Sequence, residues 1–349
     1  MLIPQSKVPL SARSNVRSMG RENNQRPSMT RFLIVATLAM VLVGCGRTAS
    51  PTGPTAKTKK GAVGVSVLTL TNPFFKVIAD TLTDELSKEG YEVIAVSGDN
   101  NVAKQQNQVK DFLVRRAAAI VLCPCDSKAI GAAIQEANQQ GVPVFTADIA
   151  CLAPEAKVIA HVATDNYQGG QQAAEAMIEA LGDVGGNIVI LDYKEVESCI
   201  LRVKGFKEVL AAYNEKHKSG KITIVKELPS GGDKDQGYKS AADALQAHDD
   251  LVGIFAINDP SALGARAALE NAKRADRIKI IGFDGQPEGK KAIREGRIYA
   301  DPIQFPDKIG RETAKAIVRY FNGDPPPPQI LIPTALYRQA DALKDPEAR

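Results

Sequence analysis

The stretch VGIFAIND, residues 252–259, is built of small and apolar residues over six positions and then turns polar at Asn258 and Asp259. A run that is apolar throughout, rather than alternating, is typical of a strand buried on both faces of a parallel sheet. The same pattern recurs at residues 63–68 before Asn72, 117–122 before Asp126, 142–147 before Asp148 and 278–283 before Asp284. Because open parallel sheets bind ligands at the carboxyl ends of their strands, these polar residues mark a candidate binding edge.

Segments with a helical spacing of apolar residues separate the runs. One covers residues 74–88 before Gly90, and another covers residues 127–140, for which Ser127 is the expected N-cap. The alternation of strands and helices extends over residues 61–337 in two series of similar rhythm. It predicts an α/β fold with two lobes, and ligands commonly bind between such lobes.

The composition sets limits on the partners of the chain. Its 349 residues are 44% hydrophobic and 24% charged, which is enough for two domains of ordinary size. The net charge is +4, but residues 1–44 hold six of the 44 basic residues and one of the 40 acidic residues. The remainder therefore has 38 basic and 39 acidic residues, and we expect no nucleic-acid partner.

The first 44 residues are typical of an export signal. The apolar run at residues 32–43 follows Arg31 and is too short to span a bilayer, which takes roughly 20 residues. It ends in LVGC, residues 42–45, which resembles the lipobox of bacterial lipoproteins, although a general secretory signal with a chance cysteine is the alternative. Translation can begin at Met1, Met19 or Met29.

These features predict a lipoprotein-type signal peptide over residues 1–44 and lipidation of Cys45. Residues 45–60 are rich in Pro, Thr, Gly and Lys and are expected to form a flexible tether. The protein is therefore expected in the periplasm, held to a bacterial membrane by lipid alone.

An ordered set of short motifs carries a family resemblance. The motifs are TNPFF (71–75), GVPV (141–144), DN (165–166), GF (205–206), ND (258–259), ALGA (262–265), GFDG (282–285) and QFP (304–306). In order and spacing the chain resembles the type I periplasmic sugar-binding proteins, with the ribose-binding branch closest, over residues 60–337.

The resemblance implies two doubly wound parallel-sheet lobes joined by a three-segment hinge. Residues 61–164 with 305–334 are then the N-terminal lobe, and residues 165–304 with 335–349 are the C-terminal lobe and tail. It further implies a monomer without cofactor, whose cleft closes on a small carbohydrate and delivers it to an ABC-type permease.

The site residues are also carried by the resemblance. Hydroxyl-binding positions of the family match Asp148, Asn258, Asp284 and Gln304, and the loop after the first strand offers Asn72, Phe74 and Phe75. An aromatic ring packs well on the apolar face of a sugar. A carboxylate that ends a buried strand, such as Asp148, must be solvated or paired, and sugar hydroxyls are good donors to it.

Several cleft positions depart from the ribose-binding branch. Ile149 and Ile200 replace two arginines, and Cys123 replaces an asparagine. Arg202 matches an arginine of the wider family, where a structural role is equally compatible. Ile149 and Cys123 are therefore candidate ligand contacts that favour a less hydroxylated or differently shaped molecule than ribose.

Other functions stay open as alternatives. Cys123, Cys151 and Cys199 are expected near the cleft, where thiolates could grip a soft metal ion, although no His or Asp accompanies them at ligand spacing. A sensor subunit that presents a ligand to a membrane receptor would share the same lobes. We expect no enzyme, because the chain has no GxSxG elbow, phosphate-binding loop or HExxH pair.

Overall fold

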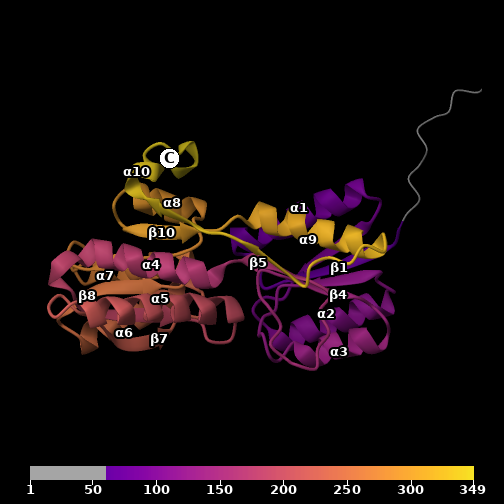
Figure 1. Cartoon of the computed structure of the whole chain (residues 1–349), viewed down its shortest axis with the longest axis horizontal. Helices are drawn as coiled ribbons and strands as arrows, with labels where there is room; N and C mark the ends of the chain where they lie inside the picture. The colour runs from indigo at the N-terminus through magenta and orange to yellow at the C-terminus, as the bar shows by residue number, and fades with distance from the viewer. Residues whose placement is uncertain (1–59) are drawn as a thin grey trace, which may run out of the picture. The chain divides into compact units, whose positions relative to one another are not determined.

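The computed structural model describes residues 60–349. The predicted signal peptide, nearly all of the predicted tether and the predicted lipidation site Cys45 lie outside the described residues. Residues 60–349 belong to one compact unit, which holds two six-stranded sheets with helices packed beside them (Figure 1). No helix within residues 60–349 has the length and apolar character needed to cross a membrane.

The N-terminal lobe is built on a sheet with the strand order β11-β5-β4-β3-β1-β2, and all neighbouring strands are parallel. Its strands are β1 (Ala62–Val67), β2 (Glu92–Ser97), β3 (Ala119–Leu122), β4 (Val144–Ala147), β5 (His161–Thr164) and β11 (Gln329–Ile332). Its helices are α1 (Pro73–Lys88), α2 (Val102–Val114), α3 (Gly131–Gln139) and α9 (Pro306–Phe321). Strands β3, β4 and β5 are buried at every position, as expected for inner strands of a parallel sheet.

The C-terminal lobe repeats this plan with the order β12-β10-β9-β8-β6-β7, in which only β12 is antiparallel to its neighbour. Its strands are β6 (Gly186–Asp192), β7 (Ile222–Pro229), β8 (Leu251–Ala256), β9 (Lys279–Ile281), β10 (Ala300–Ile303) and β12 (Ala335–Arg338). Its helices are α4 (Asn166–Leu181), α5 (Glu197–Lys216), α6 (Lys234–Ala247), α7 (Asp259–Asn271), α8 (Pro287–Arg294) and α10 (Gln339–Ala342).

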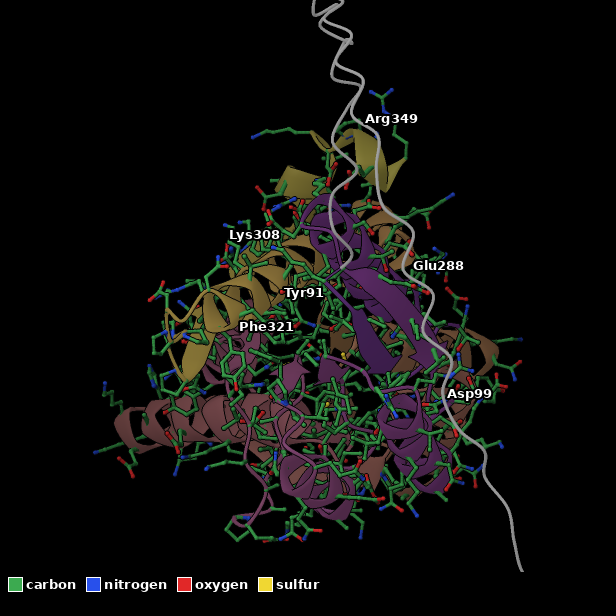
Figure 2. All side chains as sticks on the ribbon, turned by 90° about the vertical axis from the view of Figure 1, so that its right-hand side faces the viewer. Tyr91, Asp99, Glu288, Lys308, Phe321 and Arg349 are labelled. Atoms are coloured by element: carbon green, nitrogen blue, oxygen red, sulfur yellow. The ribbon has the colours of Figure 1, made fainter. Side chains whose placement is uncertain are left out.

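The chain passes between the two sheets three times: from β5 to α4, from β10 to α9, and from β11 to β12. After the second passage α9 packs beside α1 in the N-terminal lobe (Figure 1). At this contact Phe321 meets Tyr91, with ring centroids 5.7 Å apart (Figure 2). The predicted fold class, two doubly wound lobes with a three-segment hinge, is thereby confirmed.

Two glycines let α4 and α5 approach closely enough to set the position of Arg202. A Cβ on Gly170 would lie 2.0 Å from the Arg202 carbonyl oxygen, and one on Gly205 would lie 2.2 Å from the Tyr167 carbonyl oxygen. Real Cβ atoms do not approach backbone so closely, so any side chain here would push the helices apart. This close packing fixes the backbone from which Arg202 reaches the cleft.

The prediction for Ser127 is wrong. Helix α3 begins at Gly131, and residues 127–130 instead form a turn in which Asp126 Oδ1 accepts hydrogen bonds from the backbone N–H groups of Lys128 and Ala129. Ser127 Oγ instead accepts a hydrogen bond of 2.9 Å from the backbone N–H of Glu197, the first residue of α5 in the other lobe. Ser127 therefore links the lobes by capping a helix that is distant in sequence.

Candidate functional site

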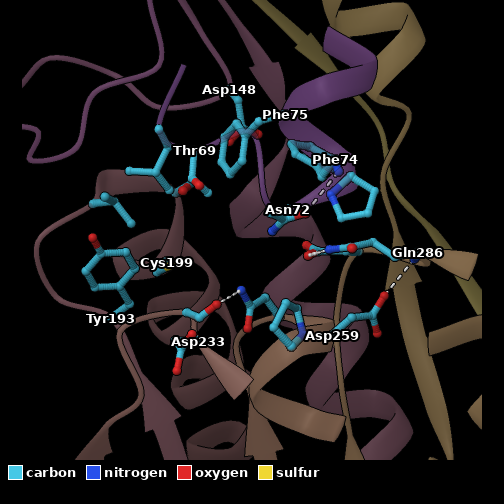
Figure 3. Close-up of a pocket in the computed structure, with 18 of the residues that line it drawn as sticks. Thr69, Asn72, Phe74, Phe75, Asp148, Tyr193, Cys199, Asp233, Asp259 and Gln286 are labelled. Carbon is cyan, nitrogen blue, oxygen red and sulfur yellow. Dashed lines mark hydrogen bonds between the residues drawn. The ribbon is translucent and has the colours of Figure 1, made fainter. Parts of the chain in front are cut away.

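A cavity of about 550 Å³ lies between the lobes, within the size range of small-molecule sites (Figure 3). It is lined by residues that follow the carboxyl ends of strands in both sheets, as expected for this kind of fold. Eight of the predicted site residues line it: Asn72, Phe74, Phe75, Asp148, Ile149, Asn258, Asp284 and Gln304. The fold therefore brings predicted site residues as far apart as Asn72 and Gln304, 232 positions in the sequence, to one cavity.

Asp148 directly follows β4 and has a backbone φ of 65°, in the left-handed region that few non-glycine residues adopt. The residue is 3% exposed, and its Oδ1 has no hydrogen-bond partner among the described residues. Burial raises the pKa of Asp148 to about 7, with the charges of Asp284 and Glu197 adding to the shift and Arg202 opposing it. Asp148 Oδ1 is therefore a buried oxygen that a ligand hydroxyl or amine could bind.

Asp284 is the centre of a hydrogen-bond network on the C-terminal side. Its Oδ1 accepts from Gln304 Nε2 at 2.6 Å and from Arg202 Nη1 at 3.2 Å, and its Oδ2 accepts from Gln286 Nε2 at 3.0 Å. Burial raises the pKa of Asp284, while the Arg202 charge lowers it. Because the amide nitrogen of Gln304 is engaged here, its buried Oε1 is left without a partner.

Arg202 is held from three sides. Its Nε donates to Asn166 Oδ1 at 2.8 Å, its Nη1 donates to the Ile257 carbonyl oxygen at 2.6 Å, and its guanidinium lies 3.8 Å from the ring centroid of Phe283. A guanidinium bound in this way loses little further freedom when a ligand arrives. Arg202 is therefore part of a pre-formed wall, which agrees with the structural role left open in the sequence.

The first loop of the N-terminal lobe presents the aromatic pair. Asn72 caps α1, because its Oδ1 accepts a hydrogen bond of 2.9 Å from the backbone N–H of Phe74. Phe74 and Phe75 meet edge to face with centroids 5.3 Å apart. Together they give this side of the cavity an apolar surface for the face of a ring.

Asn258 has a capping role in addition to its place in the cavity wall. Its Oδ1 accepts from the Ser261 N–H at 3.0 Å at the start of α7, and its Nδ2 donates to the Gly232 carbonyl oxygen at 2.9 Å. One Nδ2 hydrogen has a partner and the other is available to a ligand. Asn258 thus resembles Asn72, where helix capping also orients a side chain at the cleft.

Sequence reasoning missed Tyr193 and Gln286 as lining residues, and Asp259, which follows Asn258 at the predicted edge, lines the cavity as well. Tyr193 follows the end of β6, so the rule that polar residues follow apolar strands could have found it. Asp259 Oδ2 accepts from the Gln286 backbone N–H at 2.6 Å. Asp259 also faces Asp301, and these buried carboxyl groups share a hydrogen bond only when one of them keeps its proton.

The four cysteines of the described part of the chain do not assemble into a metal site. Cys123 is fully buried and is not among the residues that line the cavity, whereas Cys199 is. All four cysteines within residues 60–349 are free, and burial raises the pKa of the Cys199 thiol to about 12. Among the described residues no group of three His, Cys, Asp or Glu side chains could hold a metal ion. The soft-metal alternative thus gains no support from them.

Comparison with known proteins places the chain in a class. Residues 63–325 match the model of the periplasmic binding protein domain, which is most of the chain. The protein belongs to this family of periplasmic binding proteins.

Individual relatives share much of its length. The ribose import binding protein of Escherichia coli strain K12 is 32% identical over 265 residues, covering 76% of this chain and 86% of that protein. The D-apiose import binding protein of Paraburkholderia graminis is 30% identical over 275 residues, covering 78% and 86%. The crystal structure of the Caulobacter myo-inositol binding protein with myo-inositol has a TM-score of 0.76 at 26% identity, covering 85% of this chain and 99% of that one.

Proposed function

We propose that this protein captures a small carbohydrate between its lobes and delivers it to an ABC-type importer. The observation that carries this proposal is the cavity of about 550 Å³ with two buried acceptors, Asp148 Oδ1 and Gln304 Oε1, that lack partners within residues 60–349. Unpaired buried acceptors are costly unless a ligand supplies donors, and hydroxyl groups do so. Relatives named for ribose and D-apiose import support the same class of ligand.

Binding in this proposal joins two different walls. The sugar ring packs against Phe74 or Phe75, and its hydroxyls pair with Asp148 from one lobe and with Asn258, Asp284 and Gln304 from the other. Asn72 adds an amide at the rim, and Ile149 fills space where an arginine would have donated. Because both walls contact one molecule, the ligand favours the closed arrangement of the lobes, which an importer can recognise.

The cellular setting is part of the proposal. The apolar run at residues 32–43 directs export, and Cys45 receives lipid after cleavage of residues 1–44. Residues 45–60 then tether a monomeric body to the membrane surface near its permease. The lobe boundaries at 164/165, 304/305 and 334/335 act as the hinge segments.

A thermal-shift screen of the purified protein against pentoses, hexoses, deoxysugars and polyols tests the proposal. Ligand at a hundredfold excess over Kd adds about 2.7 kcal/mol, which raises Tm by roughly 4–8 °C. We expect a shift with at least one sugar, lost in Asp148→Ala and kept in Asp84→Ala, an exposed position on α1. If no carbohydrate shifts the transition, the proposed function is wrong.

A further inference from the structure

The buried charges at the cavity do not balance. Burial raises the pKa of both Asp148 and Asp284, the charge of one guanidinium, that of Arg202, lowers it in both, and all three side chains are more than nine-tenths buried. Arg202 forms its ion pair with Asp284 at 3.2 Å. Within residues 60–349 no ion pair reaches Asp148. Two buried carboxyl groups therefore share one cation, and Asp148 is the one without an ion-pair partner.

The other groups at the cavity do not supply the missing charge. Lys234, the second basic residue in the lining, pairs with Glu288 at 3.7 Å. Ile149 follows Asp148 directly and lines the same wall, and Glu197 adds a further negative charge close by. A buried charge without a partner is expensive, so a cation brought by the ligand would stabilise the closed protein.

The hydrogen-bonding groups point to the same chemistry. In the described part of the chain, the buried polar atoms of the lining that lack partners are Asp148 Oδ1, Gln304 Oε1 and Asp259 Oδ1, and all are carboxyl or amide oxygens. Asp259 can share a proton with Asp301, which leaves Asp148 and Gln304 to be satisfied. A hydroxyl donates once and also needs donors of its own, whereas an ammonium group donates three times and accepts nothing.

We infer that the ligand carries a cationic nitrogen, as in an amino sugar, and that this ammonium group sits against Asp148 with Gln304 Oε1 as a second acceptor. The inference rests on the proposed function and narrows its ligand class. The ammonium restores the charge balance between Asp148, Asp284 and Arg202, and the resulting hydrogen bond is charge-assisted in a site with little water. The remaining hydroxyls and the ring keep the contacts already described.

Calorimetric titration with matched sugars tests the inference. Glucose, glucosamine and N-acetylglucosamine differ only at one substituent, which is neutral, cationic and neutral in turn, and galactose with galactosamine gives a second pair. We expect each amine to bind at least tenfold tighter than its neutral partner at neutral pH. Asp148→Asn keeps the shape and one acceptor but carries no charge, so it should remove this preference, and each amine should then bind within about twofold of its neutral partner.

Ile149→Arg is the complementary variant. It places a cation where the amine is expected, so it should weaken the binding of each amine by tenfold or more relative to that of its neutral partner. Far-UV circular dichroism of each variant checks that the fold is intact. If neutral sugars bind as tightly as their amines, the inference is wrong and the proposed function stands. If neither the amines nor the neutral sugars bind, the inference is wrong, and the thermal-shift screen decides the proposed function separately.

Discussion

The two walls of the cleft differ in how many of their buried polar groups already have hydrogen-bond partners before a ligand binds. On the C-terminal wall Asp284 already holds Arg202, Gln304 and Gln286 in a hydrogen-bond network. On the N-terminal wall Asp148 is equally buried, but its Oδ1 has no partner. One wall is therefore built before the ligand binds, while the other is completed by it. We therefore expect substitutions in the C-terminal wall to lower the stability of the protein, and substitutions in the N-terminal wall to lower its affinity for the ligand.

Arg202→Met should have the largest effect, because it removes the cation from the pre-formed wall and leaves Asp284 buried and unpaired. We expect a loss of about 3–5 kcal/mol in the free energy of unfolding, measured by urea denaturation. Asp284→Asn in the same chain should recover most of that loss, since it removes the stranded charge. Equal stability of Arg202→Met and the parent protein would contradict the account of this wall.

Asp148→Asn should do the opposite on the other wall and stabilise the unliganded protein. The folded pKa of about 7 lies above the ordinary 3.8, so the folded state binds more protons than the unfolded state between these values. Asp148 therefore costs stability as pH rises from 4 to 7, and the variant should gain roughly 4 kcal/mol at pH 8. At pH 4 we expect almost no difference between variant and parent, which serves as the control.

His161 contributes in the opposite direction. Burial lowers the pKa of His161 to about 4 from 6.5, and Thr146 Oγ1 lies 2.9 Å from its Nδ1. Its neutral form therefore supports stability above pH 6.5, and about 3 kcal/mol is lost as pH falls to 4. Because His161 is present in both proteins, comparing Asp148→Asn with its parent at each pH cancels the contribution of His161 to stability.

Phe75→Leu should weaken binding without unfolding the protein, because leucine fills most of the space but offers no ring face. Loss of a ring contact is worth about 0.5–1.5 kcal/mol, so we expect an affinity lower by roughly 2–10-fold in calorimetric titration. Phe321→Leu is the control, since that ring packs on Tyr91 away from the cavity. An equal loss in both variants would mean that the effect is one of stability.

Ser127→Ala should have the smallest effect, and it tests the contact between the lobes. Removing the acceptor for the Glu197 N–H costs about 1 kcal/mol, as for other helix caps. Since the contact joins the two lobes, the loss should appear as an affinity lower by about fivefold, with a faster ligand off-rate in stopped-flow measurements. An unchanged off-rate would mean that this contact does not hold the lobes together.

The strands and the cleft were readable from the sequence for a physical reason. Buried parallel strands need uninterrupted apolar residues, so Asp148 and Asp284 were conspicuous where the runs end. Contacts between segments distant in sequence leave no such trace. The sequence around Ser127 indicates a cap for its own helix, and only the packing of the lobes assigns it to α5. The network around Arg202 likewise depends on Gly170, because only a residue without a side chain lets α4 approach α5 so closely, and the sequence does not show that approach.

The most direct test of the account is a crystal structure of the protein with the sugar that gives the largest thermal shift. We expect the ligand between the lobes, with a donor within about 3.2 Å of Asp148 Oδ1 and another at Gln304 Oε1, and its ring against Phe74 or Phe75. A ligand that contacts only the network of Asp284, or that binds outside this cavity, would contradict the claim that binding completes the N-terminal wall.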